Sequence, residues 1–130
     1  MELAPDFVRG SSPPLVTPFT ERGEIDFVTY EALVEFQISH GSHGIVVNGT
    51  TAEPSVLTVA ERKSLLEVAI SVAAGRAPVV AATGSQSLAD TLELTEHAAW
   101  AGANALLIVT PYYVRPPQRG LISYFSEVAS

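Results

Sequence analysis

The sequence predicts an α/β protein with a parallel sheet, because short apolar runs alternate with longer amphipathic segments along the whole chain. The apolar runs do not alternate with polar residues, and strands of this kind are covered on both faces, as in parallel α/β sheets. One run and one segment together occupy roughly 30 residues, about one βα unit of a (β/α)8 barrel. Four such units in 130 residues are either a small complete sheet or half of a barrel of ~250 residues.

Four apolar runs are the predicted strands. They cover residues 15–17, 44–47, 78–82 and 105–109. Each run leads into a loop that contains threonine, glycine or proline. Because ligands of both candidate architectures bind where parallel strands end, we expect the functional residues in these loops.

Four amphipathic segments are the predicted helices, and three begin at a side chain that can cap free backbone amides: Asp26, Thr58 and Ser87. The last begins at about Gln118. Three of the helices are followed by a glycine that can supply a left-handed turn: Gly41, Gly75 and Gly102. The 3.6-residue spacing predicts these core-facing residues: Phe27, Tyr30, Val34 and Ile38; Val59, Leu66, Ala69, Ile70 and Ala73; Leu88, Leu92 and Ala99; Leu121, Phe125 and Val128.

The charge and composition of the chain limit the kinds of partner it is expected to bind and its expected cellular location. The formal net charge is −7 and the few basic residues form no cluster, so we expect no nucleic acid. No apolar stretch approaches the ~20 residues of a membrane helix, and the N-terminus lacks a signal-peptide pattern, so we expect no membrane association. Without cysteine there is no disulfide or thiolate chemistry, and the expected location is the cytoplasm.

The loop after the second predicted strand is Asn48-Gly49-Thr50-Thr51-Ala52-Glu53. Its hydroxyls and backbone amides can hold a carboxylate or a phosphate without any formal positive charge. The alternative is an ordinary polar turn whose threonines hydrogen-bond to the backbone. Glu53, at the end of the loop, is expected to anchor the turn by accepting backbone amides.

The loop after the fourth predicted strand carries two adjacent phenols, Tyr112 and Tyr113, between prolines. A phenol hydroxyl that is hydrogen-bonded to another hydroxyl, such as that of Thr50, can relay a proton. The alternative is packing at an interface, which tyrosine also suits.

Taken together, the ordered motifs Gly49-Thr50-Thr51-Ala52-Glu53 and Thr110-Pro111-Tyr112-Tyr113 resemble the dihydrodipicolinate synthase and N-acetylneuraminate lyase family. Thr17-Pro18-Phe19 and Gly102-Ala103-Asn104-Ala105 stand where that family has similar segments. The resemblance implies a (β/α)8 TIM barrel, of which residues 1–130 would be the N-terminal half of a single domain with roughly the first four βα units. It also implies a lyase or aldolase that forms a Schiff base between a lysine and pyruvate or a related 2-oxo acid.

The resemblance assigns roles by motif position. Thr50 and Thr51 would hold the pyruvate carboxylate, and Thr50 and Tyr113 would relay protons. Tyr113 would act across a dimer interface in a homodimer or homotetramer, while Tyr112 and Gly49 would support the site. No metal and no cofactor are implied, and the partner is a small 2-oxo acid.

The loop motifs are more similar to the dihydrodipicolinate synthase branch, which joins pyruvate to aspartate semialdehyde in lysine biosynthesis. The alternatives are a paralogous sugar-acid or N-acetylneuraminate-type aldolase or dehydratase, or a non-catalytic α/β module that binds anions or supports assembly. Ala52 stands where the synthases usually have glycine, so the loop would differ if this position required a positive φ.

The family's Schiff-base lysine ends its sixth strand, which residues 1–130 do not include, so the chain alone is expected to be inactive. Its single lysine, Lys63, lies toward the polar side of the second predicted helix and reads as a surface lysine. Arg62 points to the apolar side of the same helix, and we expect a packed stem with an ion-paired head, at a subunit contact.

Overall fold

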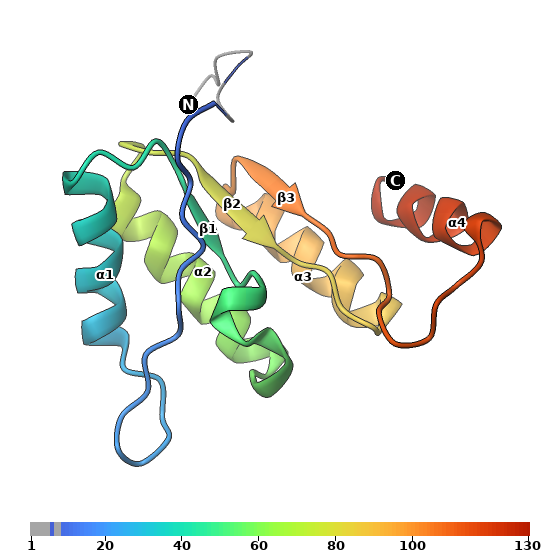
Figure 1. The fold of residues 1–130 in the computed structure, drawn as a ribbon, viewed down its shortest axis with the longest axis horizontal. Helices are drawn as coiled ribbons and strands as arrows, with labels where there is room; N and C mark the ends of the chain where they lie inside the picture. Colours follow the sequence, from blue (N-terminus) through green and yellow to red (C-terminus); the bar gives the residue numbers. More distant parts are fainter. Residues whose placement is uncertain (1–5, 7–8) are drawn as a thin grey trace.

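A three-stranded parallel sheet with helices packed along it forms the centre of the molecule (Figure 1). The structure is a computed structural model that describes residue 6 and residues 9–130. The strands are β1 (Ile45–Val47), β2 (Val79–Ala82) and β3 (Ala105–Leu107), and they lie in the order β1-β2-β3. The helices are α1 (Phe27–Ser39), α2 (Val59–Ala73), α3 (Leu88–Ala101) and α4 (Gln118–Val128), with two short 3-10 turns, η1 (Thr50–Ala52) and η2 (Pro54–Val56).

The first predicted strand pairs with β1 in parallel, although it is reduced to an isolated bridge between Pro14 and Val46. Two backbone hydrogen bonds of 3.0 Å hold it, from Leu15 to Val46 and from Val46 to Pro13. The order of the four predicted strands along the sheet is therefore their order in the sequence. Sequential parallel neighbours joined by helices are what the four βα units predict.

The helix starts agree with the predicted caps. Asp26 accepts a hydrogen bond from the Thr29 amide at 3.0 Å, and Ser87 accepts one from the Asp90 amide at 3.2 Å. At the start of α2 the Thr58 hydroxyl accepts from the Glu61 amide, and the Glu61 carboxylate accepts from the Thr58 amide. These bonds satisfy backbone donors that the first helical turn leaves without partners.

The predicted inner faces are confirmed in part. In α1 and α2 most expected residues are buried or half-buried in the core cluster with β1 and β2. In α3 the prediction holds only for Leu92, which is half-buried, and is wrong for Leu88 and Ala99, which are exposed. The buried residues of this helix are Thr91, Leu94 and Ala98. The hydroxyl of Thr91 donates to the Ser87 carbonyl and accepts from the Ser85 amide, so this polar side chain is buried without losing hydrogen bonds. In α4, Tyr124 is buried and Phe125 is exposed, which reverses the prediction for that residue.

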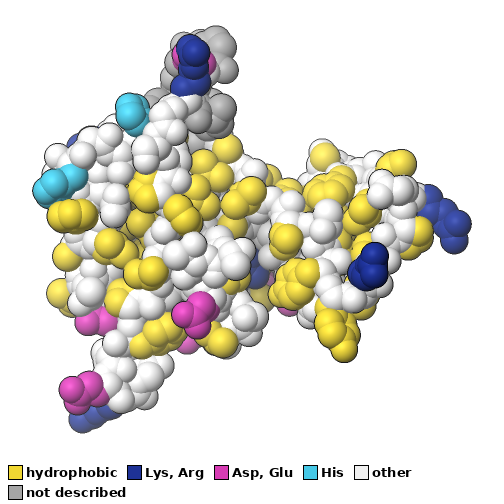
Figure 2. Space-filling view, viewed as in Figure 1, with side chains coloured by type: hydrophobic (Ala, Val, Ile, Leu, Met, Phe, Trp, Pro, Cys, Tyr) yellow, Lys and Arg dark blue, Asp and Glu magenta, His cyan; other side chains and the backbone are white. Residues whose placement is uncertain are grey.

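One face of the sheet and its β3 edge remain open. In Figure 1, α2 and α3 lie behind the strands, and α4 packs beside α3. Figure 2 shows hydrophobic side chains gathered on the uncovered face and over α4. Leu106 and Leu107 of β3 are 41% and 50% exposed, although β1 and β2 are largely buried. Among the described residues, none of the helices combines the length and the apolar character that crossing a membrane requires.

Candidate active site at the carboxyl ends of the strands

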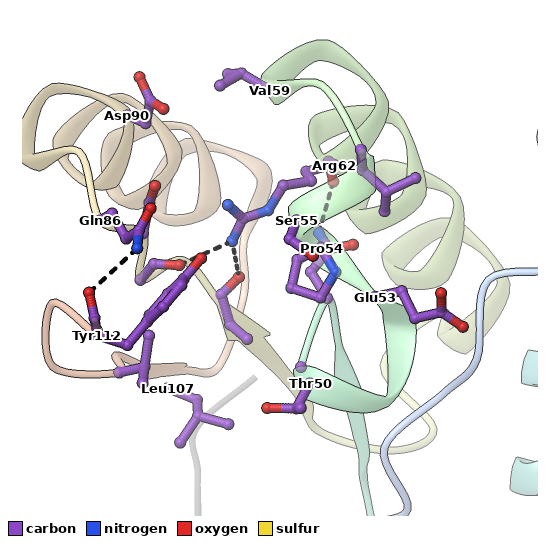
Figure 3. Close-up of a pocket in the computed structure, with 17 residues that line it drawn as sticks. Thr50, Glu53, Pro54, Ser55, Val59, Arg62, Gln86, Asp90, Leu107 and Tyr112 are labelled. Atoms are coloured by element: carbon purple, nitrogen blue, oxygen red, sulfur yellow. Dashed lines mark hydrogen bonds between the residues drawn. The ribbon is translucent and has the colours of Figure 1, made fainter.

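A cleft of about 660 Å³ opens at the carboxyl ends of the strands, where the sequence predicts the site (Figure 3). Its walls come from four segments: the loop after β1 with η2, the start of α2, the end of β2 with the residues that follow it, and the end of β3 with the residues that follow it. Thr50 lines one side, and Tyr112 and Leu107 line the other. The two predicted loops therefore meet at one cleft.

The Thr50 loop offers free donors. It folds into the 3-10 turn η1, in which the Ala52 amide donates to the Gly49 carbonyl at 2.9 Å. Within residues 9–130 neither the Thr50 nor the Thr51 amide donates to a protein acceptor. Both residues are exposed, so two adjacent N–H groups and two hydroxyls are available to an anion.

Ala52 fits the loop without backbone strain. It is not among the residues with a positive φ, and its carbonyl accepts a 2.9 Å hydrogen bond from the hydroxyl of Thr17. The positive φ values fall on its neighbours in the loop, Asn48 at 60° and Glu53 at 55°. The expectation for Glu53 is wrong, since its carboxylate accepts no hydrogen bond in the described part of the chain and the side chain is exposed. Its backbone in the left-handed region separates η1 from η2 instead.

The two tyrosines take opposite positions. Tyr112 lines the cleft, its ring points toward Arg62 in Figure 3, and its carbonyl accepts a 3.2 Å hydrogen bond from Gln86. Tyr113 is 92% exposed, has a φ of 73°, and does not line the cleft. The structure thus brings Thr50 together with Tyr112 in one chain and directs Tyr113 outward into solvent.

Arg62 is the site residue that sequence reasoning placed but misread. It is 5% exposed and lines the cleft, and its guanidinium donates to the carbonyls of Ala82 at 3.0 Å and Gly84 at 3.3 Å. No carboxylate lies within 4 Å of it among the described residues, so the predicted ion pair is wrong. Burial lowers the pKa of Arg62, and the nearby Tyr112 and Asp90 partly offset that effect. The sequence feature that marked Arg62 was its position on the apolar side of α2.

Lys63, the next residue along α2, lies outside the cleft. Its ammonium pairs with the Glu93 carboxylate of α3 at 2.6 Å, which agrees with the surface position predicted for it. Asn48, which the sequence analysis did not single out, lines the cleft and is 5% exposed. Asparagine tolerates the left-handed region better than most residues, which was its only sequence signal.

Comparison with known proteins agrees with this geometry. A sequence model of the Dihydrodipicolinate synthetase family matches residues 7–130. The 4-hydroxy-tetrahydrodipicolinate synthase of Agrobacterium fabrum is 50% identical over 121 residues, which are 93% of this chain and 41% of that protein.

Solved structures agree as well. Dihydrodipicolinate synthase from Aquifex aeolicus superimposes with a TM-score of 0.89 at 43% identity, over 92% of this chain and 41% of that one. The chloride-inhibited enzyme from Acinetobacter baumannii complexed with pyruvate gives 0.89 at 41% identity, over the same shares of each chain.

The chain therefore spans about two fifths of the length of the proteins it matches. Those structures are TIM barrels, and the parallel strands with their helices correspond to the first βα units of one. The match extends over nearly all of the sequence and includes both loops of the cleft. This chain belongs to the dihydrodipicolinate synthetase family, an enzyme family of lyases.

Proposed function

We propose that residues 1–130 are the N-terminal half of a single-domain lyase that joins pyruvate, or a related 2-oxo acid, to an aldehyde through a lysine Schiff base. The most similar activity is that of 4-hydroxy-tetrahydrodipicolinate synthase, with aspartate semialdehyde as the second substrate. The observation that carries the proposal is the placement of the free Thr50 and Thr51 amides at the carboxyl edge of a parallel sheet, in a chain of this family.

The carboxylate of the 2-oxo acid would lie against the Thr50 loop. Within residues 9–130 these two successive amides have no protein acceptor and can donate to an anion, and the hydroxyls of Thr50 and Thr51 can donate further hydrogen bonds. The side chain of Thr50 is directed toward Leu107 across the cleft (Figure 3). In this position its hydroxyl can also take part in moving a proton to or from the bound substrate.

Tyr113 would complete the proton relay from a neighbouring subunit. A tyrosine that is 92% exposed with a positive φ is held away from its own chain, as a residue that reaches into a partner would be. Tyr112 and Gly49 would support the site from within the same chain. The active assembly would then be a homodimer or a homotetramer of the full-length protein.

The Schiff base needs a lysine that residues 1–130 do not provide. A Schiff-base lysine must be largely deprotonated, and Lys63 is held outside the cleft in an ion pair with Glu93. Incubating the 130-residue chain with pyruvate and borohydride should therefore give no covalent adduct by mass spectrometry. The full-length protein, treated in the same way, should gain one pyruvate-derived mass on a lysine beyond residue 130. An adduct on Lys63 would contradict this part of the proposal.

Kinetics of the full-length protein test the site and the second substrate. Thr50→Val should lower kcat by about a hundredfold or more, the usual contribution of a positioned proton donor. Thr95→Val removes a hydroxyl on α3 that donates to the Thr83 hydroxyl outside the cleft lining and should leave kcat and KM unchanged. Condensation of pyruvate with aspartate semialdehyde identifies the synthase. Adduct formation without that condensation would instead favour the alternative, a paralogous sugar-acid or N-acetylneuraminate-type aldolase or dehydratase.

A further inference from the structure

Arg62, on α2, forms hydrogen bonds with the residues that follow β1 and with the carboxyl end of β2, next to the Thr50 loop. Its backbone carbonyl accepts a 2.8 Å hydrogen bond from the side-chain amide of Asn48, the last residue before Gly49 and Thr50. Its guanidinium donates to the carbonyls of Ala82 and Gly84, at the carboxyl end of β2. A single residue of α2 thus links the end of β1 to the end of β2, directly beside the cleft (Figure 3).

Asn48 transmits this link to the loop. It is 5% exposed and has a φ of 60°, a conformation that turns the chain out of β1 and into η1. Because a backbone carbonyl can only accept, the side-chain NH2 group of Asn48 must face Arg62, and this fixes the side chain. The position of α2 therefore determines the direction in which Gly49 and Thr50 leave the sheet.

An arginine is an unfavourable choice here if stability is its only purpose. A cation that is buried without a carboxylate loses solvation, and an apolar side chain of similar size at such a position is often neutral or stabilising. The guanidinium instead reaches both carbonyls at the end of β2 and faces the ring of Tyr112 from the opposite loop (Figure 3). Its hydrogen bonds hold the start of α2 against the carboxyl end of β2.

We propose that Arg62 is a positioning residue which, together with Asn48, sets the location of the Thr50 amides and hydroxyl for the reaction. This inference rests on the proposed function and goes beyond it, since the side-chain hydrogen bonds of Arg62 within the described residues go to backbone carbonyls and give it a holding role. Loss of the guanidinium should displace the Thr50 loop, and a displacement of about 1 Å can lower a reaction rate by ~100-fold.

The test uses the full-length enzyme with Arg62→Met, which keeps an apolar stem and the carbonyl that accepts from Asn48 but removes the side-chain donors that hold α2 to the end of β2. We expect kcat/KM to fall by roughly tenfold to a hundredfold while the thermal midpoint changes little. Arg76→Met is the matched control, because Arg76 also donates to backbone carbonyls, those of Ala73 and Val72, but lies at the far end of α2. The control should keep both kcat and KM. Partial recovery in Arg62→Lys, which restores a charge and donors, is expected.

A double-mutant cycle separates positioning from a general loss of structure. If Arg62 acts through the loop, Thr50→Val should cost at least about tenfold less in the Arg62→Met background than in the wild type, because the hydroxyl is already misplaced. The inference would be overturned if the two substitutions lowered kcat/KM by independent factors that multiply in the double mutant. It would also be overturned if the kcat/KM of Arg62→Met stayed within about twofold of the wild-type value. Should Arg62→Met fail to fold, Asn48→Gly keeps the left-handed backbone without the side-chain bond and should show the same fall. Wild-type kinetics for Asn48→Gly would equally overturn it.

Amide hydrogen exchange keeps this inference distinct from the proposed function. The amides of residues 49–53 should exchange faster in Arg62→Met than in the wild type, while those of α1 should not change. An enzyme that never forms the pyruvate adduct refutes the proposed function, and the exchange measurement still reports on the loop. Unchanged exchange at residues 49–53 would refute the positioning role whatever the activity.

Discussion

At the scale of single residues, the cleft depends on the backbone amides of the Thr50 loop and on the few side chains that hold this loop in place. Among the described residues the amides of Thr50 and Thr51 meet no protein acceptor, because η1 needs only the Ala52 and Glu53 amides to close its turns. Thr17 holds the same loop from the opposite side through the Ala52 carbonyl. The loop can therefore present donors to a ligand without itself being loose.

Two glycines at the cleft should respond differently to an added methyl group. A Cβ on Gly84 would lie 2.5 Å from the Val109 backbone nitrogen, whereas a Cβ on Gly49 would meet nothing closer than Val46 at 3.6 Å. Gly84→Ala should therefore lower the free energy of unfolding by about 1–3 kcal/mol, the usual cost of overpacking. Gly49→Ala is the control and should change it little. Urea unfolding measures both, and equal stabilities for the two variants would contradict the prediction.

Some residues of the cleft could be recognised from the sequence, and others could not. Motifs pointed to Thr50 and Tyr112, which line the cleft, because their loops follow recognisable apolar runs. Asn48 and Arg62 could not be assigned in this way, because their importance comes from carbonyls that lie 14 and 20 residues away. Local patterns carry no information about which distant carbonyl a buried donor will meet.

At the scale of elements, helix starts follow local chemistry. The caps at Asp26, Thr58 and Ser87 were predicted and are present, because each bond joins residues only three positions apart. The end of α3 shows a longer link: Asn104 exchanges two hydrogen bonds of 2.8 Å with Val79, which ties the start of β3 to β2. The faces of α3 and α4 were predicted less well, because their neighbours decide them.

The capping box of α2 should make stability depend on acid pH. Hydrogen bonds from the Thr58 amide and then from its hydroxyl lower the pKa of Glu61 below its ordinary value of 4.5. A lowered folded-state pKa stabilises the fold above the unfolded value, and this contribution is lost as the pH falls through the folded value. Wild-type protein should therefore exceed Glu61→Gln in stability near neutral pH, with the difference vanishing in acid well below pH 4.5.

Urea unfolding at a series of pH values measures this difference. Glu96→Gln is the matched control, since the Glu96 carboxylate on α3 accepts no hydrogen bond among the described residues. That variant should follow the wild type at every pH. A constant difference between wild type and Glu61→Gln across the acid range would show that the capping carboxylate does not act through its charge.

At the scale of the whole molecule, the open β3 edge of the sheet determines how the chain associates with other chains. In a barrel β3 would have a parallel neighbour on each side, but here one side of the strand faces solvent. Leu106, Leu107 and Val109 are each more than 40% exposed along this edge. An apolar strand edge of this kind readily pairs with another chain.

The 130-residue chain by itself should therefore form dimers or larger assemblies in light scattering, and the remaining βα units should suppress them. Leu106→Lys places a charge on the edge strand and should shift the distribution toward monomer. Val28→Lys is the control, because Val28 is 79% exposed on α1, away from the edge. A stable, monodisperse wild-type monomer would contradict the prediction.

The sequence alone determined the order and type of the elements, the helix caps and the two loops that meet at the cleft. These features follow from apolar periodicity and from hydrogen bonds between residues a few positions apart, so they are written locally in the chain. Only the tertiary structure decided that Arg62 is held by carbonyls, that Thr91 is buried, and that Tyr112 faces inward while Tyr113 faces outward. Burial and the partners of buried polar groups depend on which distant segments the fold brings together, and local periodicity does not specify that.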